Sequence, residues 1–217
     1  MSRARRNWLT LLSFVAILAI AWMTLPASRR TVLRRAGWML VASDPSEPAD
    51  AVVIAVDADA AGTLEAADLI HAGVAQQVAI FTDPPDYTVA NEFARRGVQY
   101  ESGSRRSLRE LEQLGVRNAY SISGYVQGTE DEGPALAHWC DQQHLKSVVV
   151  VTTPDHSRRL RRTLQRSMQG REIRVSVRAA RYSLFDPDHW WESHAGVRIE
   201  LEEAEKLLLD IVRHPFS

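Results

Sequence analysis

The chain has 217 residues, of which 45% are hydrophobic and 24% charged, and its formal net charge is -1. This length suits one domain of ordinary size. The near-neutral charge excludes the general electrostatic attraction of a nucleic-acid-binding protein, so we expect no nucleic-acid partner. The single cysteine, Cys140, excludes an intrachain disulfide bond and a cysteine-based zinc site.

The chain begins with an apolar segment. Residues 8–25 contain three hydroxyl residues and are otherwise apolar, which is close to the ~20 residues that a helix needs to cross a bilayer. Arginines lie on both flanks of this segment. The pattern predicts an uncleaved membrane anchor over residues 1–28, and a cleaved signal peptide is the alternative. The two flanks carry nearly equal positive charge, so charge alone does not assign the side of the membrane.

Strands and helices are expected to alternate through the rest of the chain. After a linker over residues 29–49, we expect one domain over residues 50–217. Apolar runs predict strands over 51–56, 77–81, 119–122, 147–151 and 173–177. Helical spacing predicts helices over 63–71, 89–96, 107–114, 129–143, 156–168 and 197–212. This alternation predicts an α/β fold with a Rossmann-like parallel sheet and helices on both faces.

The most suggestive polar segment follows the fourth expected strand. Ligands of open parallel sheets bind beyond the carboxyl ends of the strands, and here Thr152 and Thr153 precede an expected helix. Free backbone N–H groups, the helix dipole and Arg158 would favour an anion. His156 could transfer a proton or hold a phosphate oxygen. The alternative is a well-capped helix with a solvated basic face.

Two further segments carry polar groups at strand ends. Thr129 and Glu132 could face a ligand, although this spacing is also that of a capping box. Asp57 and Asp59 follow the first strand and could hold Mg²⁺ or Ca²⁺. A polar turn explains the two aspartates more simply, and we assign no metal site.

A cluster of arginines marks the helix expected over residues 156–168. We expect most of them to form a solvated face, with only Arg158 placed for a ligand. No aromatic residues are interleaved for base stacking. The chain also lacks the fingerprints of dinucleotide-binding oxidoreductases, P-loop enzymes, α/β-hydrolases and zincins, so no cofactor is assigned.

Several motifs in fixed order resemble one known family. The chain resembles the YdcF-like domain, which also occurs in the bacterial envelope proteins ElyC and SanA. Thr129 and Glu132 fall where that family has N-T-x-E-N. The other matching segments are Ala49 to Ile54, Ala66 to Gly73, Thr152 to Arg159 (similar to T-S-x-x-H-x-x-R), Trp190 to Ser193, and Glu203-x-x-Lys206.

The chain also departs from this family pattern. Val56 and Asp57 stand where the family has a glycine pair, Thr63 stands near the position of an expected arginine, and Thr82-Asp83-Pro84 replaces S-G-G. The resemblance implies a Rossmann-like fold, a single-pass protein of the plasma (inner) membrane with an extracytoplasmic domain, and a role in the cell envelope. It implies no specific reaction.

Three functions follow from these observations. The first is binding or processing of an anionic, phosphate-bearing small molecule in cell envelope biogenesis, and whether the protein is an enzyme is left open. The second is a non-catalytic pseudo-enzyme or interaction module at the membrane, and the third is a binder of a nucleotide or S-adenosyl-type ligand. For the first, the candidate catalytic residues are His156 and Glu132, and the candidate ligand-binding residues are Thr152, Thr153, Arg158, Thr129 and Asp57.

Overall fold

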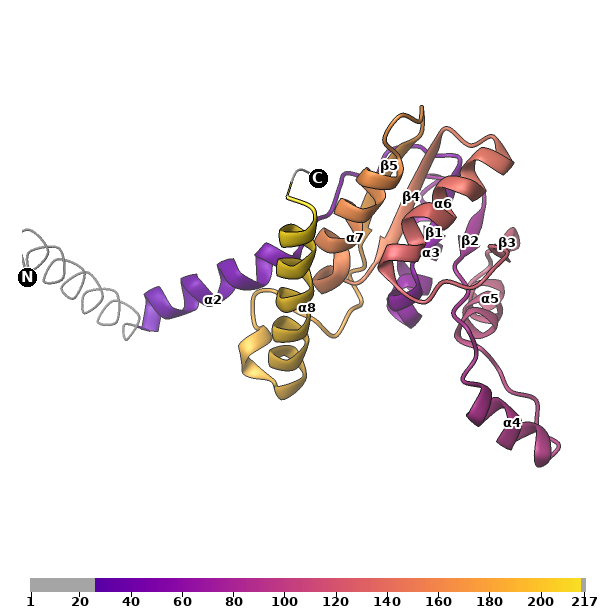
Figure 1. Cartoon of the computed structure of the whole chain (residues 1–217), viewed down its shortest axis with the longest axis horizontal. Helices are drawn as coiled ribbons and strands as arrows, with labels where there is room; N and C mark the ends of the chain where they lie inside the picture. Colours follow the sequence, from indigo (N-terminus) through magenta and orange to yellow (C-terminus); the bar gives the residue numbers. More distant parts are fainter. Residues whose placement is uncertain (1–25, 216–217) are drawn as a thin grey trace, which may run out of the picture.

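The computed structural model describes residues 26–215, which contain a five-stranded parallel sheet (Figure 1). The strand order is β3-β2-β1-β4-β5. The strands are β1 (Ala51–Ile54), β2 (Val78–Ile80), β3 (Ala119–Ser121), β4 (Ser147–Thr152) and β5 (Arg174–Ala179). The chain reverses its direction across the sheet between β1 and β4, which is the switch point of a Rossmann-like fold. The predicted α/β fold class is confirmed.

Helices cover both faces of this sheet. The elements are α2 (Pro26–Leu40), η1 (Val56–Ala58), α3 (Asp59–His71), α4 (Tyr87–Arg95), α5 (Gly103–Gln113), α6 (Thr129–Gln143), α7 (Pro154–Ser167), η2 (Trp190–Glu192) and α8 (His194–Arg213). α3 packs beside α5, and α6 packs beside α7. Right-handed crossovers place the two pairs on opposite faces, because the chain crosses the sheet in opposite directions before and after β3.

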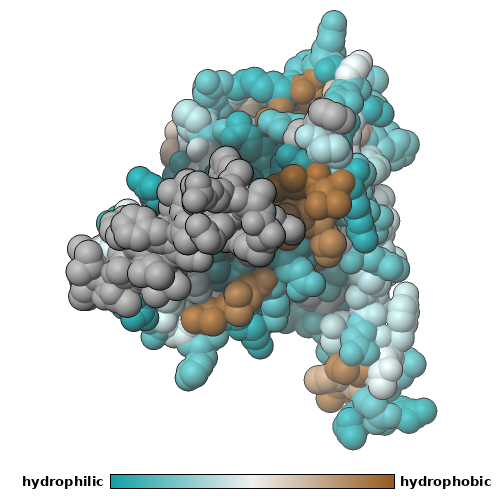
Figure 2. All heavy atoms as spheres, turned by 60° about the vertical axis from the view of Figure 1, so that its left-hand side comes forward, coloured by the Kyte–Doolittle hydropathy of each residue, from teal (hydrophilic) through white to brown (hydrophobic). Residues whose placement is uncertain are grey.

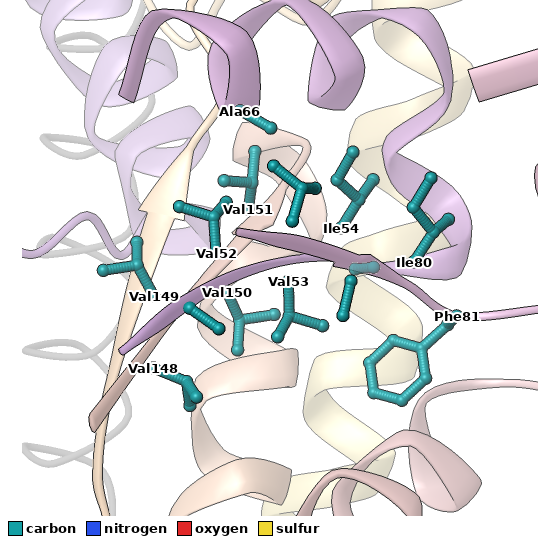
Figure 3. Packing of buried hydrophobic residues seen from close by; sticks show 14 of the residues in the cluster. Val52, Val53, Ile54, Ala66, Ile80, Phe81, Val148, Val149, Val150 and Val151 are labelled. Carbon is teal, nitrogen blue, oxygen red and sulfur yellow. The ribbon is translucent and has the colours of Figure 1, made fainter. Parts of the chain in front are cut away.

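The core lies where β1 and β4 run side by side. All four residues of β1 are buried, which explains the continuous apolar run of that strand. Figure 3 shows Val52 and Ile54 on the side of the sheet where Ala66 lies, with Val53 and Val150 on the other side. Both faces of the central strands are therefore covered by apolar contacts with helices.

The N-terminal part of the expected linker over residues 29–49 is helical. α2 packs against α7 and α8, and its last residue, Leu40, forms a small buried cluster with Phe185 and Leu207. Arg158 donates a hydrogen bond to the Val41 carbonyl oxygen at 2.7 Å. α2 is thus fixed to the domain by apolar contacts and by hydrogen bonding.

The expected membrane anchor over residues 1–28 lies almost entirely outside the described residues. Within residues 26–215, no helix combines the length and apolar character needed to span a bilayer.

The basic face of α7 differs from the solvated face expected for it. Arg162 and Arg166 both bind Asp210 of α8, at 2.5 and 2.7 Å, and the Asp210 side chain is 7% exposed. Burial alone would raise the pKa of Asp210, but hydrogen bonds from the two arginines hold it below its ordinary value. These arginines therefore join two helices, and the prediction of a solvated face is wrong for them.

The close approach of α6 and α7 depends on Gly133. A Cβ atom at this position would collide with the Ser167 hydroxyl and lie 3.1 Å from Thr163 Cγ2. Gly133→Ala is therefore expected to lower the free energy of unfolding by about 1–3 kcal/mol, although alanine favours helices. Chemical denaturation of the full chain measures this, with Gln142→Ala on the exposed side of α6 as the matched control. Equal stability of Gly133→Ala and the unmodified chain would contradict the described packing.

Candidate functional site

A cleft of about 730 Å³ opens at the carboxyl ends of β1 and β4, between η1, the start of α7 and one side of α8. This is the position that open parallel sheets use for ligands. Its lining is rich in charge. The acidic residues are Asp57, Asp59, Asp155, Glu202 and Glu203, and the basic residues are His156, Arg198 and Lys206.

His156 is the centre of the polar groups at this cleft. Its side chain is only 2% exposed. The Nε2 atom lies 3.0 Å from Thr129 Oγ1, 3.7 Å from Asp57 Oδ2 and 3.9 Å from Glu132 Oε2. The end of β1, the start of α6 and the start of α7 therefore converge on one imidazole nitrogen.

The other nitrogen of His156 faces α8. Its Nδ1 atom lies 3.3 Å from Glu203 Oε2 and 2.8 Å from Arg159 Nη2. Arg159 also donates to Glu203 Oε2 at 3.1 Å and to Thr129 Oγ1 at 2.6 Å. Lys206 donates to Glu203 Oε1 at 2.6 Å. The ring is held from both sides, so its orientation is fixed.

These contacts set the charge of the cluster. Burial alone would lower the pKa of His156, but the carboxylates of Glu132 and Glu203 outweigh it and raise the pKa to about 9. Burial alone would raise the pKa of Glu203, but His156, Lys206 and Arg159 lower it to about 2. At neutral pH the cleft therefore contains a buried imidazolium paired with a carboxylate.

Glu132 joins α6 to the end of β1. Its Oε1 atom accepts a hydrogen bond from the Val56 backbone N–H at 2.8 Å, and its side chain is buried. α6 is preceded by Gly128, and no side chain caps this helix. The capping-box alternative for Thr129 and Glu132 is therefore wrong, because both side chains point to the His156 cluster instead.

The remaining predicted residues have different surroundings. Thr153 is the N-cap residue of α7 and lines the cleft, but its side chain does not cap the helix. Thr152 Oγ1 is buried without a hydrogen-bond partner among residues 26–215. Arg158 is not brought to the cleft, since its guanidinium binds the Val41 carbonyl of the segment after α2. For Asp57 and Asp59, the described part of the chain contains no group of three side chains suited to a metal.

Sequence reasoning missed the α8 side of the cluster. Arg159 belongs to the basic face of α7 and ends the H-x-x-R motif, and Glu203 and Lys206 form the E-x-x-K motif, but none of these patterns predicts a contact with His156. The available signal was the three-residue spacing of His156 and Arg159, which places both on one face of α7. On α8, Glu203 lies on the same buried face as Leu207 and Asp210.

A second buried acid lies beside the cleft. Burial and the nearby charge of Asp155 raise the pKa of Glu200 to about 7, and Glu200 Oε2 has no hydrogen-bond partner among the described residues. Burial also raises the pKa of Asp155. Burial and repulsion between carboxylates therefore raise the pKa values of two neighbouring acids beside the cleft.

The raised pKa of His156 predicts a pH-dependent stability. The folded state holds the proton of His156 more tightly than the unfolded state, so this contribution is complete below about pH 6.5 and is lost as the pH rises through about 9. The difference corresponds to about 3 kcal/mol, or a fall in Tm of roughly 6–12 °C between pH 6 and pH 10. Glu200 adds a fall in the same direction at lower pH, because its pKa is also raised.

Thermal unfolding of the full chain measures this dependence. His156→Gln should remove most of the fall above pH 6.5, whereas His138→Gln, on the exposed side of α6, should leave it in place. A fall of the same size in His156→Gln would show that another group is responsible.

Comparison with known proteins assigns no family. No family model matches this chain, and no curated protein matches it.

Proposed function

We propose that this protein is a membrane-anchored envelope protein of the YdcF-like type that binds or processes a phosphate-bearing small molecule at the His156 cleft. The observation that supports this proposal most strongly is the position of His156. It lies at the switch point of the sheet, with Thr129, Glu132 and Asp57 within 4 Å of one nitrogen. Convergence of acid–base groups at a ligand-binding edge is typical of a catalytic or binding centre.

The proposed chemistry begins with His156 as a proton donor. As an imidazolium it can protonate a leaving oxygen or hold a phosphate oxygen. Asp57 is the neighbour of Nε2 that reaches the cleft, with a side chain 57% exposed, so it can relay a proton to or from the substrate. Glu203 acts as a positioning residue, because it accepts a hydrogen bond from Nδ1 of the imidazolium, and Arg159 in turn donates to the Glu203 carboxylate.

The charge of the cleft restricts the substrate. Carboxylates outnumber cations in its lining, so a bare phosphate would be repelled as well as attracted. Hydroxyl or amine groups on the substrate would donate hydrogen bonds to the free carboxylates and offset this repulsion. The site therefore favours a phosphate ester of a polyol or sugar over inorganic phosphate.

The second candidate function is a non-catalytic interaction module. His156 is 98% buried and both of its ring nitrogens have partners within the chain, so the cluster could serve only to join α6, α7 and α8. A substrate would have to displace the Asp57 side chain to reach Nε2. This function predicts no small-molecule ligand.

The nucleotide or S-adenosyl alternative has less support. In a dinucleotide-binding fold, the backbone N–H groups after the first strand face the ligand phosphates. Here the N–H of Val56 is taken by Glu132, and the loop contains no glycine before Gly62.

A thermal-shift screen tests the proposed function. The full chain is heated with inorganic phosphate, glycerol 3-phosphate, sugar phosphates, polyprenyl phosphates and nucleotides. We expect glycerol 3-phosphate or a sugar phosphate to raise Tm, because a ligand at about 100 times its Kd stabilises the folded state by about 2.7 kcal/mol. Asp57→Asn should weaken this effect, and it is expected to fold because Asp57 is half exposed. Glu92→Gln on α4 is the control. Absence of stabilisation by every phosphate ester would favour the interaction module.

The membrane assignment is tested by fractionation. We expect the full chain to stay with membranes after a carbonate wash, because residues 8–25 are apolar. Deletion of residues 1–25 should release it. An alkaline phosphatase fused after Ser217 should be active, as an extracytoplasmic domain requires. Release of the full chain by carbonate would contradict the anchor, and an inactive fusion would contradict the orientation.

A further inference from the structure

A second cavity opens on the same edge of the sheet, outside the His156 cleft. It has a volume of about 450 Å³ and lies at the carboxyl ends of β2 and β3, between α4, α5 and the loop after β3. This volume is within the ~300–1,000 Å³ typical of small-molecule sites. Its aromatic lining consists of Tyr87, Tyr100 and Tyr125. We call it the tyrosine pocket.

The charged groups and the tyrosine hydroxyls of the tyrosine pocket have no partners among the described residues. Asp83 and Arg105 both line it, yet within residues 26–215 neither side chain has an ion-pair or hydrogen-bond partner, and the same holds for the three tyrosine hydroxyls. Elsewhere the arginines of α7 and β5 are largely paired with carboxylates. Opposite charges that face one pocket without pairing are free to bind the donors and acceptors of a ligand.

α4 forms a wall of this pocket without being packed into the domain. It has no buried residue, and Tyr87 and Phe93 are 63% and 41% exposed. Figure 1 shows α4 standing away from the sheet. The ring of Phe93 in α4 contacts the ring of Tyr100, which lies in the segment after this helix. The chain's own packing therefore leaves the apolar side of this wall uncovered.

We infer that the tyrosine pocket binds the saccharide portion of a ligand. A sugar ring presents C–H faces that pack on aromatic rings, and hydroxyls that both donate and accept hydrogen bonds. The tyrosines supply the rings, and Asp83 and Arg105 supply an acceptor and a donor. Further hydroxyls come from Thr82, Ser102, Ser104 and Ser121. An apolar ligand would leave Asp83, Arg105 and the tyrosine hydroxyls without partners.

The pocket lies within reach of the His156 cleft. The loop after β3 carries Tyr125 in the pocket and leads to Thr129, which contacts His156. β3 lies two strands from β1, which corresponds to about 10 Å at the usual strand spacing. The idea that the bound saccharide also carries a phosphate rests on the proposed function. Saccharide binding by the tyrosine pocket does not depend on that function.

Saccharide binding is tested by calorimetry on the full chain in a zwitterionic detergent that has no sugar headgroup. The probes are N,N′-diacetylchitobiose, cellobiose and maltose, with uridine and adenosine for comparison. We expect at least one disaccharide to bind. We expect Tyr125→Ala to raise the Kd for that disaccharide about three- to tenfold. Tyr125→Phe should keep most of the affinity because it keeps the ring. Arg105→Ala should weaken binding, whereas Arg106→Ala, its exposed neighbour outside the pocket, should not.

The outcomes separate this inference from the proposed function. Absence of disaccharide binding, binding unaffected by Tyr125→Ala and Arg105→Ala, or binding of nucleosides alone would overturn the saccharide assignment. The stabilising effect of glycerol 3-phosphate, which has no sugar ring, should persist in Tyr125→Ala. Disaccharide binding without any effect of phosphate esters would support this inference while removing the proposed function.

Discussion

The buried pair of His156 and Glu203 is the interaction on which the C-terminal half of the domain depends. Taking an ion out of water costs several kcal/mol, and attraction between two buried ions offsets this only when further hydrogen bonds complete the pair. Here Arg159 and Lys206 both donate to Glu203, and Thr129 lies within hydrogen-bonding distance of the ring. Each charge is compensated only if α7 and α8 keep this one register.

The pairing of α7 with α8 also shapes the His156 cleft and fixes the position of α2. α8 forms one wall of the His156 cleft, and its Leu207 packs with Leu40 at the end of α2. Further along the two helices, Arg162 and Arg166 share Asp210. The face of α7 that meets α8 is basic, and the face of α8 that meets α7 is acidic. The pairing of these two helices fixes the imidazole of His156, and through Leu207 it also positions α2.

The sequence predicted the sheet well and the contacts between helices poorly. The buried strands β1, β2 and β4 are apolar runs, and the alternation of strands with helices allowed the edge strands β3 and β5 to be recognised as well, all within a few residues. His156 could be singled out because its loop follows a central strand. The family motifs include Arg159 and Glu203, but the contact between them could not be predicted, because they are 44 residues apart in the chain and a basic helix face has the same sequence pattern whether it meets solvent or acids. Glu132 was ambiguous for a similar reason, since a glutamate near a helix start serves equally as a cap or as an acceptor for another strand.

The positions where the chain departs from the YdcF-like pattern are informative in this light. Asp57 stands in place of a glycine and lies 3.7 Å from His156 Nε2, and Asp83 stands in place of another and lines the tyrosine pocket. Each of these two residues places a carboxylate at a position where the YdcF-like pattern has no side chain. At the His156 cleft the added carboxylate helps to raise the pKa of the imidazole, and at the tyrosine pocket it adds an unpaired acceptor. Both carboxylates line a cavity, so under the proposed function each of them would be available to the ligand.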